Sequence, residues 1–266
     1  MDRPPALVLM YHQIVPDPMP RGWVPSRLAD SRYGVRLSDF RRQMESLRNR
    51  GVPVVSLEDW LAGRSPSSPF SAGVCILTFD DGYESDHDLA APVLDSMGFP
   101  ATFFVSTGFL GMPGMLTPEK VVSLSGNPLF RIGSHGVSHR FLSQLSDREC
   151  RMELAGSLVR IRELTGQTEV DLSAPGGRTG PGLLRLAVSV GYRCLMTSEP
   201  GVLHSADGLF SIPRLPVLRH HAVAQFDRLS DPSTFSFRLN RWIRSGRKSV
   251  RKMMDRVRGI SGRPLA

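Results

Sequence analysis

The sequence predicts an α/β fold in which parallel strands are connected by helices. Short apolar runs rich in β-forming residues alternate with helical patterns along the 266 residues, and this alternation is typical of an open doubly wound sheet or a barrel. The composition, 41% hydrophobic and 22% charged, is that of a globular protein. No apolar run approaches the roughly 20 residues of a membrane-spanning helix, so we expect no transmembrane segment.

The predicted strands are short β-rich apolar runs bounded by turn-forming residues. In chain order they cover residues 6–10, 52–55, 74–79, 102–105, 131–133, 172–174, 193–197 and 215–218. Two segments between them are expected to be loops: residues 16–36, which are rich in Pro, Arg and Ser, and residues 108–117. We see no internal repeat.

The predicted helices lie between these strands and carry recognisable start signals. They cover residues 39–50, 57–62, 85–97, 147–164 and 181–190. We expect Ser38 and Ser56 to be N-caps of the first two. Ser146 and Glu149 have the spacing of a capping box, and Pro181 stands where a first helical turn accepts proline.

The positive charge is concentrated at the C-terminal end. Residues 238–266 contain ten Lys or Arg and one acid, Asp255, so the rest of the chain is close to neutral although the net charge is +8. Apolar residues recur there at helical spacing, which predicts an amphipathic stretch that could contact an anionic membrane. A solvated basic tail is an equally good interpretation. We therefore divide the chain into a domain of residues 1–232 and a basic tail of residues 233–266, and we expect no nucleic-acid binding, because no recognised motif accompanies the charge.

The N-terminal residues and the cysteines bear on the cellular location of the protein. The N-terminus has an early Asp, two prolines and a short apolar run without a cleavage site, so we expect no signal peptide. Cys75, Cys150 and Cys194 are odd in number and form no CxxC motif, so reduced, buried thiols are expected. Both features predict a cytoplasmic protein, with the basic tail placing it at the inner face of a membrane.

Two adjacent carboxylates, Asp80 and Asp81, follow the predicted strand 74–79 and precede Gly82. At a strand end, a turn can bring both side chains into one site, where one carboxylate binds a metal and the other handles a proton. An Asp-Asp-Gly turn is also common without any such role.

Two histidines favour the functional interpretation. His135 and His139 follow the predicted strand 131–133, and on a helical turn positions four apart share a face and could grip one cation. With Asp81 they would form a site of two histidines and one carboxylate, which leaves coordination positions open for water and substrate.

These two motifs resemble those of one known family. The segments Thr78-Phe79-Asp80-Asp81-Gly82 and Ser134-His135-Gly136-Val137-Ser138-His139 are similar, in order and separation, to the motifs of the polysaccharide deacetylases with the NodB homology domain (carbohydrate esterase family 4). The resemblance extends over about residues 7–218, and the opening Leu9-Met10-Tyr11-His12 resembles the poly-N-acetylglucosamine deacetylase branch. It implies a distorted, incomplete (β/α) barrel with its site at the C-terminal strand ends.

The resemblance also implies a role for each motif residue. Asp81, His135 and His139 would hold a divalent metal, and Asp80 would be the general base that takes a proton from the water activated by that metal. Zinc (Zn2+) is our first choice, and Co2+, Ni2+ or Mn2+ would suit the same ligands.

The third family motif, Arg-x-Pro-x-Gly, is altered. Ser173 stands in place of the arginine that usually orients the base, and Arg178 is displaced from that position. Pro175 and Gly176 remain, and the backbone N–H of Gly176 is expected to face the developing oxyanion. An ordinary Pro-Gly-Gly loop is the alternative.

Two histidines compete for the role of general acid. His221, in Leu218-Arg219-His220-His221, matches the last family motif only briefly. His12 lies at the end of the first predicted strand, like the other site residues, and we favour it.

The sequence thus predicts a metal-dependent hydrolase that removes N-acetyl groups from an N-acetylated carbohydrate, either a polymer or a sugar conjugate, with O-acetyl esters as second choice. Two other functions stay open. One is an inactive carbohydrate-binding protein, which the loss of arginine at Ser173 would allow. The other is a related metal-dependent hydrolase of a non-sugar amide.

Overall fold

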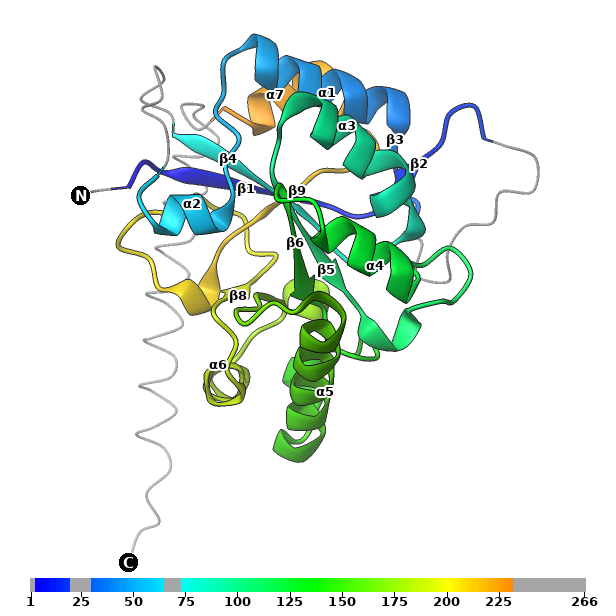
Figure 1. The fold of residues 1–266 in the computed structure, drawn as a ribbon. Helices are drawn as coiled ribbons and strands as arrows, with labels where there is room; N and C mark the ends of the chain where they lie inside the picture. Colours follow the sequence, from blue (N-terminus) through cyan, green and yellow to red (C-terminus); the bar gives the residue numbers. More distant parts are fainter. Residues whose placement is uncertain (1–2, 20–29, 65–72, 232–266) are drawn as a thin grey trace, which may run out of the picture.

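The computed structural model describes residues 3–19, 30–64 and 73–231 of the chain (Figure 1). Its central sheet has the strand order β8-β7-β6-β5-β4-β1-β9, and every neighbouring pair of strands is parallel. The sheet curls into an incomplete barrel, which confirms the predicted fold. Its strands are β1 (Ala6–Tyr11), β4 (Val74–Phe79), β5 (Ala101–Val105), β6 (Phe130–Ser134), β7 (Leu172–Ser173), β8 (Leu195–Met196) and β9 (Leu215–Pro216).

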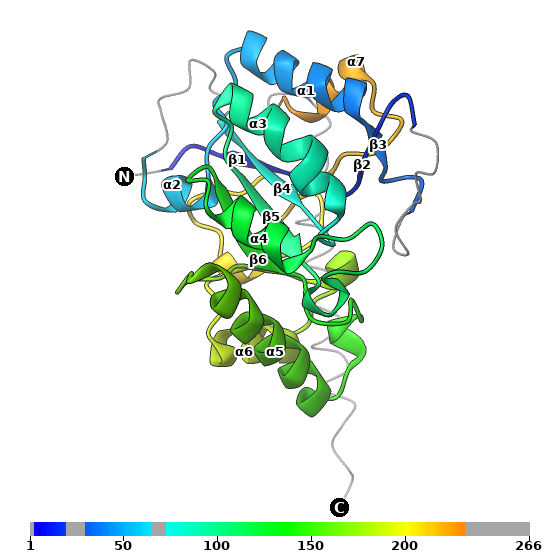
Figure 2. The ribbon, with the colours of Figure 1, turned by 45° about the vertical axis from the view of Figure 1, so that its right-hand side comes forward.

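Helices cover the outer face of this sheet. In Figures 1 and 2, α1, α3 and α7 lie together beside β1 and β4, while α5 and α6 lie together at the other end of the sheet. The helix α4 packs against β6, between these two groups. The bounds are α1 (Leu37–Asn49), α2 (Leu57–Leu61), α3 (Ala91–Met97), α4 (Pro118–Ser125), α5 (Asp147–Thr165), α6 (Pro181–Val190) and α7 (Val223–Leu229). A π-helix spans Asp86–Ala90, and 3-10 helices span Thr107–Phe109, Leu142–Gln144, Pro175–Gly177 and Leu209–Ser211.

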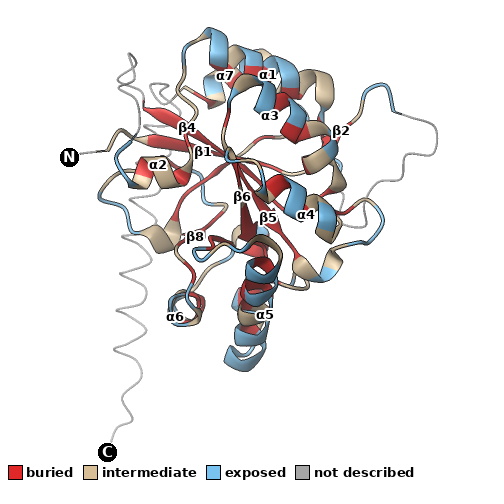
Figure 3. Ribbon diagram, in the orientation of Figure 1, coloured by how far each residue is buried: buried red, intermediate tan, exposed pale blue. Residues whose placement is uncertain are grey.

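Both faces of the central strands are buried, as Figure 3 shows in red. Along β1, Leu7 and Leu9 face the helices, while Ala6 and Val8 face the inside of the barrel. Trp60 of α2 belongs to the inner cluster, and its indole N–H donates to the carbonyl of Pro4. The short helix α2 thereby covers the interior near the start of β1.

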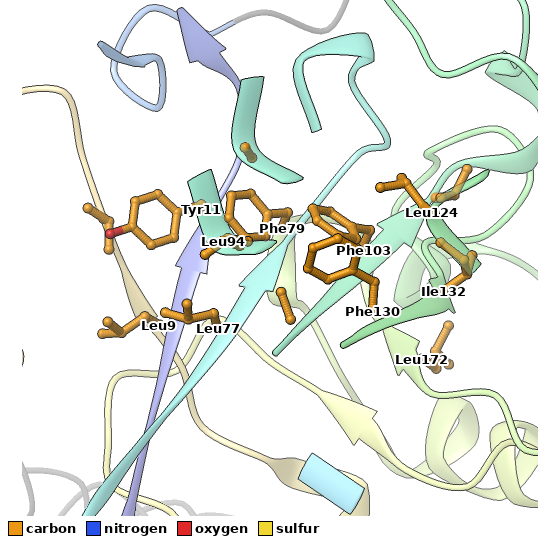
Figure 4. Close-up of a cluster of buried hydrophobic side chains, with 14 of the residues drawn as sticks. Leu9, Tyr11, Leu77, Phe79, Leu94, Phe103, Leu124, Phe130, Ile132 and Leu172 are labelled. Carbon is orange, nitrogen blue, oxygen red and sulfur yellow. The ribbon is translucent and has the colours of Figure 1, made fainter. Parts of the chain in front are cut away.

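Aromatic rings on four neighbouring strands form the centre of the outer core (Figure 4). The ring centroids of Tyr11 and Phe79 lie 5.2 Å apart, those of Phe79 and Phe103 5.0 Å, and those of Phe103 and Phe130 5.5 Å. These separations are typical of favourable aromatic pairs. The ladder links β1, β4, β5 and β6, and candidate site residues follow β1, β4 and β6.

Most predicted helix starts are confirmed, and one is wrong. Ser56 caps α2, Ser146 and Glu149 form the capping box of α5, and Pro181 opens α6. The first helix begins at Leu37, before Ser38. Ser38 cannot cap this helix because it lies inside the first turn, where its hydroxyl and its N–H bind the carboxylate of Asp17.

Other differences concern short elements. The predicted strand 52–55 is reduced to one bridge between Val54 and Cys75. The predicted helix 85–97 is divided into the π-helix and α3. The predicted loop 16–36 contains β3 (Val35–Arg36), which pairs with β2 (Ile14–Val15). The helices α4 and α7 were not predicted, since segments of eight and seven residues show too little of a helical period.

The structure also bears on the cysteines and on membrane-spanning helices. Cys75, Cys150 and Cys194 are buried free thiols, as predicted. None of the described helices is long and apolar enough to cross a bilayer. The proposed tail, residues 233–266, lies outside the described residues.

Candidate metal and active site

The polar residues of the two motifs meet at one edge of the sheet. Asp80 and Asp81 directly follow β4, and His135 directly follows β6. The carboxyl ends of parallel strands share an edge, so residues distant in sequence come together there. All three residues are almost fully buried, with exposures between 2% and 4%.

Asp81, His135 and His139 form a three-ligand cluster, with one ligand atom from each side chain lying within 4.8 Å of the others. The Oδ1 atom of Asp81 is 3.4 Å from Nε2 of His135 and 3.1 Å from Nε2 of His139. The Nδ1 atom of His135 lies 2.9 Å from the carbonyl oxygen of Ser173, which requires that Nδ1 carry the proton. Nε2 is therefore the atom of His135 that would bind a cation. A divalent cation fits this donor set, because one nitrogen from each imidazole and one carboxylate oxygen converge on the same place.

The two histidines do not lie on a helical turn, which corrects the geometry expected from their spacing. They flank an irregular loop, and the backbone is left-handed at Gly136 (φ 76°) and at His139 (φ 56°). Asp81 is left-handed too (φ 82°). Two of the three candidate ligands thus sit in a backbone conformation that is uncommon for residues other than glycine and that often marks a functional site.

Asp80 is held by a buried arginine that the sequence analysis missed. Nη1 and Nη2 of Arg214 donate to Oδ1 and Oδ2 of Asp80 at 2.7 and 2.6 Å. Arg214 is fully buried, and its Nε atom donates to the carbonyl of Thr197. Such a two-pronged contact fixes the plane of the carboxylate.

Ser173 takes part in the same contact. Its hydroxyl donates to Oδ2 of Asp80 and accepts from Nη2 of Arg214. Ser173, at the position where the family motif predicts an arginine, therefore contacts an arginine from another segment. One signal was available: Arg214 is a lone charge in the apolar run Ile212–Val217, and a buried arginine needs a carboxylate partner.

Charged and hydrogen-bonding neighbours lower the pKa values of both Asp80 and Asp81. Burial raises the pKa of Asp80, but Arg214 together with the nearby His135 and His12 outweighs this effect, and the pKa lies below its usual value. Burial also raises the pKa of Asp81, but hydrogen bonds with His135 and His139 hold it well below its usual value. Both groups are therefore ionised at neutral pH, as a base and a metal ligand must be.

A third carboxyl behaves in the opposite way. Asp86, in the π-helix, is fully buried, and neither of its carboxyl oxygens has a hydrogen-bond partner among the described residues. Burial and the charges of Asp81 and Asp80 raise the pKa of Asp86 well above its usual value.

His12 and His221, the two candidates for the general acid, have different surroundings. The imidazole of His12 follows β1 and interacts electrostatically with Asp81 and Asp80. Its buried Nδ1 atom has no hydrogen-bond partner in the described part of the chain, and its ring centroid lies 4.3 Å from that of Tyr33. By contrast, Nδ1 of His221 accepts a hydrogen bond from the backbone of Leu218. The structure therefore brings His12 toward the carboxylates and ties His221 to its own turn.

Pro175 and Gly176 begin the 3-10 helix that follows β7, next to Ser173. Gly176 is left-handed (φ 66°), and a Cβ atom there would lie 2.5 Å from Cε1 of Phe141. The Phe141 ring, two residues after His139, thus occupies the space of a side chain at position 176. Arg178 does not reach Asp80: its guanidinium lies over the Phe141 ring, 4.6 Å from the centroid.

With this geometry in view, comparisons with known proteins bear on the family. Residues 67–195, just under half of the chain, match the polysaccharide deacetylase family profile. The match confirms the resemblance to the polysaccharide deacetylases. The deacetylase-like protein YxkH of Bacillus subtilis (strain 168) is 27% identical over 210 residues, which cover 79% of this chain and 70% of that protein. These matches confirm the predicted enzyme class, a hydrolase of the polysaccharide deacetylase type.

Two further similarities bear on fold and substrate. The Streptococcus pyogenes deacetylase PplD, solved in complex with acetate, superimposes with a TM-score of 0.73 at 23% identity, over 86% of this chain and all of that one. A poly-beta-1,6-N-acetyl-D-glucosamine N-deacetylase of Escherichia coli (strain K12) is 33% identical over 81 residues, which are 30% of this chain and 12% of that protein. The first similarity shows the deacetylase fold, and the second concerns a small part of a much longer relative.

Proposed function

We propose that this polysaccharide deacetylase is a metal-dependent de-N-acetylase of an N-acetylated sugar polymer or sugar conjugate. One observation carries the proposal. The carboxylate of Asp80, which is bound by Arg214, lies next to a cluster of one carboxylate and two imidazoles. Such a pair separates the two tasks of amide hydrolysis, activation of the carbonyl and removal of a proton from water.

Asp81, His135 and His139 would hold the cation, most simply zinc. When bound, a divalent cation supplies Lewis acidity, which polarises the acetamide carbonyl and makes the attacking water more acidic. Asp80 takes the proton of that water, because Arg214 and Ser173 occupy its oxygens from one side and fix its orientation. The backbone N–H of Gly176 stabilises the oxyanion that forms on the acetamide.

The remaining step is protonation of the sugar amine as it leaves. We assign it to His12, which shares the electrostatic field of Asp80 and Asp81. Burial lowers the pKa of His12, although both carboxylates oppose this shift. The protonated ring is consequently a stronger acid than free histidine, which favours proton transfer to an amine.

The substrate class rests on the relatives. The Escherichia coli relative is named for poly-beta-1,6-N-acetyl-D-glucosamine, and the family profile for polysaccharides. An N-acetylglucosamine polymer or conjugate is therefore our first choice of substrate.

The test is acetate release from short N-acetylglucosamine oligomers by full-length protein, stripped of metal and reloaded with Zn2+ or Co2+. Wild type is expected to release acetate only with metal, and Asp80→Asn is expected to bind metal with little activity. Asp95→Asn, at an exposed acid of α3, is the matched control and should resemble wild type. Metal-loaded wild type that deacetylates no sugar but hydrolyses a non-sugar amide would contradict the proposed substrate class.

We also propose that residues 238–266 hold the protein on an anionic membrane surface, at the cytoplasmic side. Ten basic residues against one acid, with apolar residues at helical spacing, support this proposal. Cosedimentation with vesicles containing an anionic lipid should fall when these residues are deleted and when salt is raised. Equal binding by the full-length and the shortened protein would contradict it.

A further inference from the structure

The loop that joins the two candidate histidine ligands is gripped by a carboxylate from α5. Oε2 of Glu153 accepts hydrogen bonds from the backbone N–H groups of Val137 and Ser138 at 2.8 and 2.9 Å. Oε1 accepts a hydrogen bond from the hydroxyl of Ser138. Successive N–H groups that converge on one anion form a concave anion site, and here the protein's own side chain fills it.

The opposite side of the loop is fixed by backbone groups. The N–H groups of Thr107 and Gly108 donate to the carbonyls of Gly136 and Val137 at 3.0 and 2.8 Å. The loop is therefore held between the 3-10 helix Thr107–Phe109 and the side chain of Glu153. On the side of α5, Glu153 accepts the hydrogen bonds that the loop N–H groups donate.

The surroundings leave little freedom in this contact. A Cβ atom at Gly136 would lie 3.2 Å from Oε2 of Glu153, and one at Gly156 would lie 3.3 Å from Cγ2 of Val137. Glycine disfavours a helix relative to alanine, and at Gly156 the missing side chain allows α5 to approach the loop closely. Helix and loop are fitted to each other at Glu153.

We propose that Glu153 is a positioning residue for the metal site, acting on His139 through Ser138. His139 has a left-handed backbone (φ 56°), which is unfavourable for histidine and persists when the surroundings impose it. The hydrogen bonds to Ser138, the preceding residue, impose it here. The inference rests on the proposed function, since it concerns the loop of that same candidate site.

The first test measures metal affinity by titrating stripped full-length protein with Zn2+, without substrate. Glu153→Ala should weaken binding by about 10- to 100-fold, the usual effect of losing a group that supports a ligand. Glu153→Gln keeps an acceptor for both N–H groups and should restore most of the affinity. Glu163→Ala, at an exposed glutamate of the same helix, is the matched control and should bind like wild type.

The second test does not require metal. Amide hydrogen exchange at Val137 and Ser138 should be faster in Glu153→Ala than in wild type or in Glu163→Ala. Unchanged exchange, or a Glu153→Ala variant with wild-type zinc affinity, would overturn the proposal. Wild type that binds zinc but releases no acetate would instead count against the proposed function, so the two failures are distinct.

Discussion

At the scale of single residues, the buried ion pair between Asp80 and Arg214 decides how the candidate base works. The arginine lowers the pKa of Asp80 against the effect of burial, and it fixes the carboxylate by two hydrogen bonds. A base of low pKa is intrinsically weak, so its efficiency depends on orientation and on a water already made acidic by the metal. The ion pair therefore serves to orient the Asp80 carboxylate, and it does not make Asp80 a stronger base.

Replacing Arg214 should change the pH dependence of the reaction. Removal of the guanidinium takes away the group that most strongly opposes the effect of burial on Asp80, so the pKa of Asp80 rises and the acid limb of kcat/KM should move to higher pH. The lowered pKa of Asp80 also means that its ionised form stabilises the fold at pH values above the unfolded-state pKa of about 3.9. This stabilisation is lost as the pH falls through the pKa of the folded state. Arg214→Ala should therefore unfold more easily at neutral pH, by about 3–5 kcal/mol for a broken buried pair.

Arg214→Lys is the companion variant, because it keeps the charge but not the fork. It should be more stable than Arg214→Ala and show a smaller shift of the acid limb. Profiles of kcat/KM against pH and urea unfolding measure the two effects. An acid limb that stays in place in both variants would show that Asp80 is not the titrating base.

The two candidate acids can be separated by parallel substitutions. His12→Ala should lower kcat by about 10²- to 10⁴-fold, the usual contribution of proton transfer, and should abolish the basic limb of the pH profile. That limb should lie below the usual histidine value of about 6.5, because burial lowers the pKa of His12. His221→Ala should leave the profile as it is. The reverse pattern would transfer the role to His221.

At the scale of elements, features encoded by neighbouring residues could be predicted from the sequence, and contacts between distant segments could not. Asp80, Asp81 and His135 were predicted because they lie within two residues of the end of an apolar strand. The caps of α2 and α5 were predicted because each is encoded within four residues. Arg214 was missed because its partner lies 134 positions away. The position of Phe141 against Gly176 likewise depends on packing between separate loops, which a single sequence does not display.

The loop Pro175–Gly177 offers a test of such packing. Gly176→Ala would place Cβ 2.5 Å from Cε1 of Phe141 in a left-handed backbone, so we expect about a tenfold loss of kcat/KM as the oxyanion N–H is displaced. Removing the ring in the double variant Gly176→Ala/Phe141→Ala should recover part of this loss, while backbone strain keeps the rest. A double-mutant cycle on kcat/KM measures the coupling, and strictly additive effects would contradict the contact.

At the scale of the whole molecule, stability depends on a sheet buried on both faces. Phe103 lies on β5 between Phe79 and Phe130 and is fully buried. Phe103→Ala should lower the free energy of unfolding by about 3–5 kcal/mol, through lost burial and the cavity left behind. Val188→Ala, at a half-exposed valine of α6, should change it by less than about 0.5 kcal/mol. Urea unfolding measures both variants, and similar losses would contradict the central role of the aromatic ladder.

Metal binding should also stabilise the whole fold, because its candidate ligands join the ends of β4 and β6. A cation that binds the native state alone adds about 2.7 kcal/mol at a hundredfold excess over Kd. For a domain of this size, that corresponds to a rise in Tm of about 5–10 °C. Asp81→Asn keeps a residue that tolerates left-handed backbone but loses the charge, so its Tm should rise far less when Zn2+ is added. Calorimetry of stripped and reloaded protein makes the comparison, and equal shifts in wild type and Asp81→Asn would place the bound metal elsewhere.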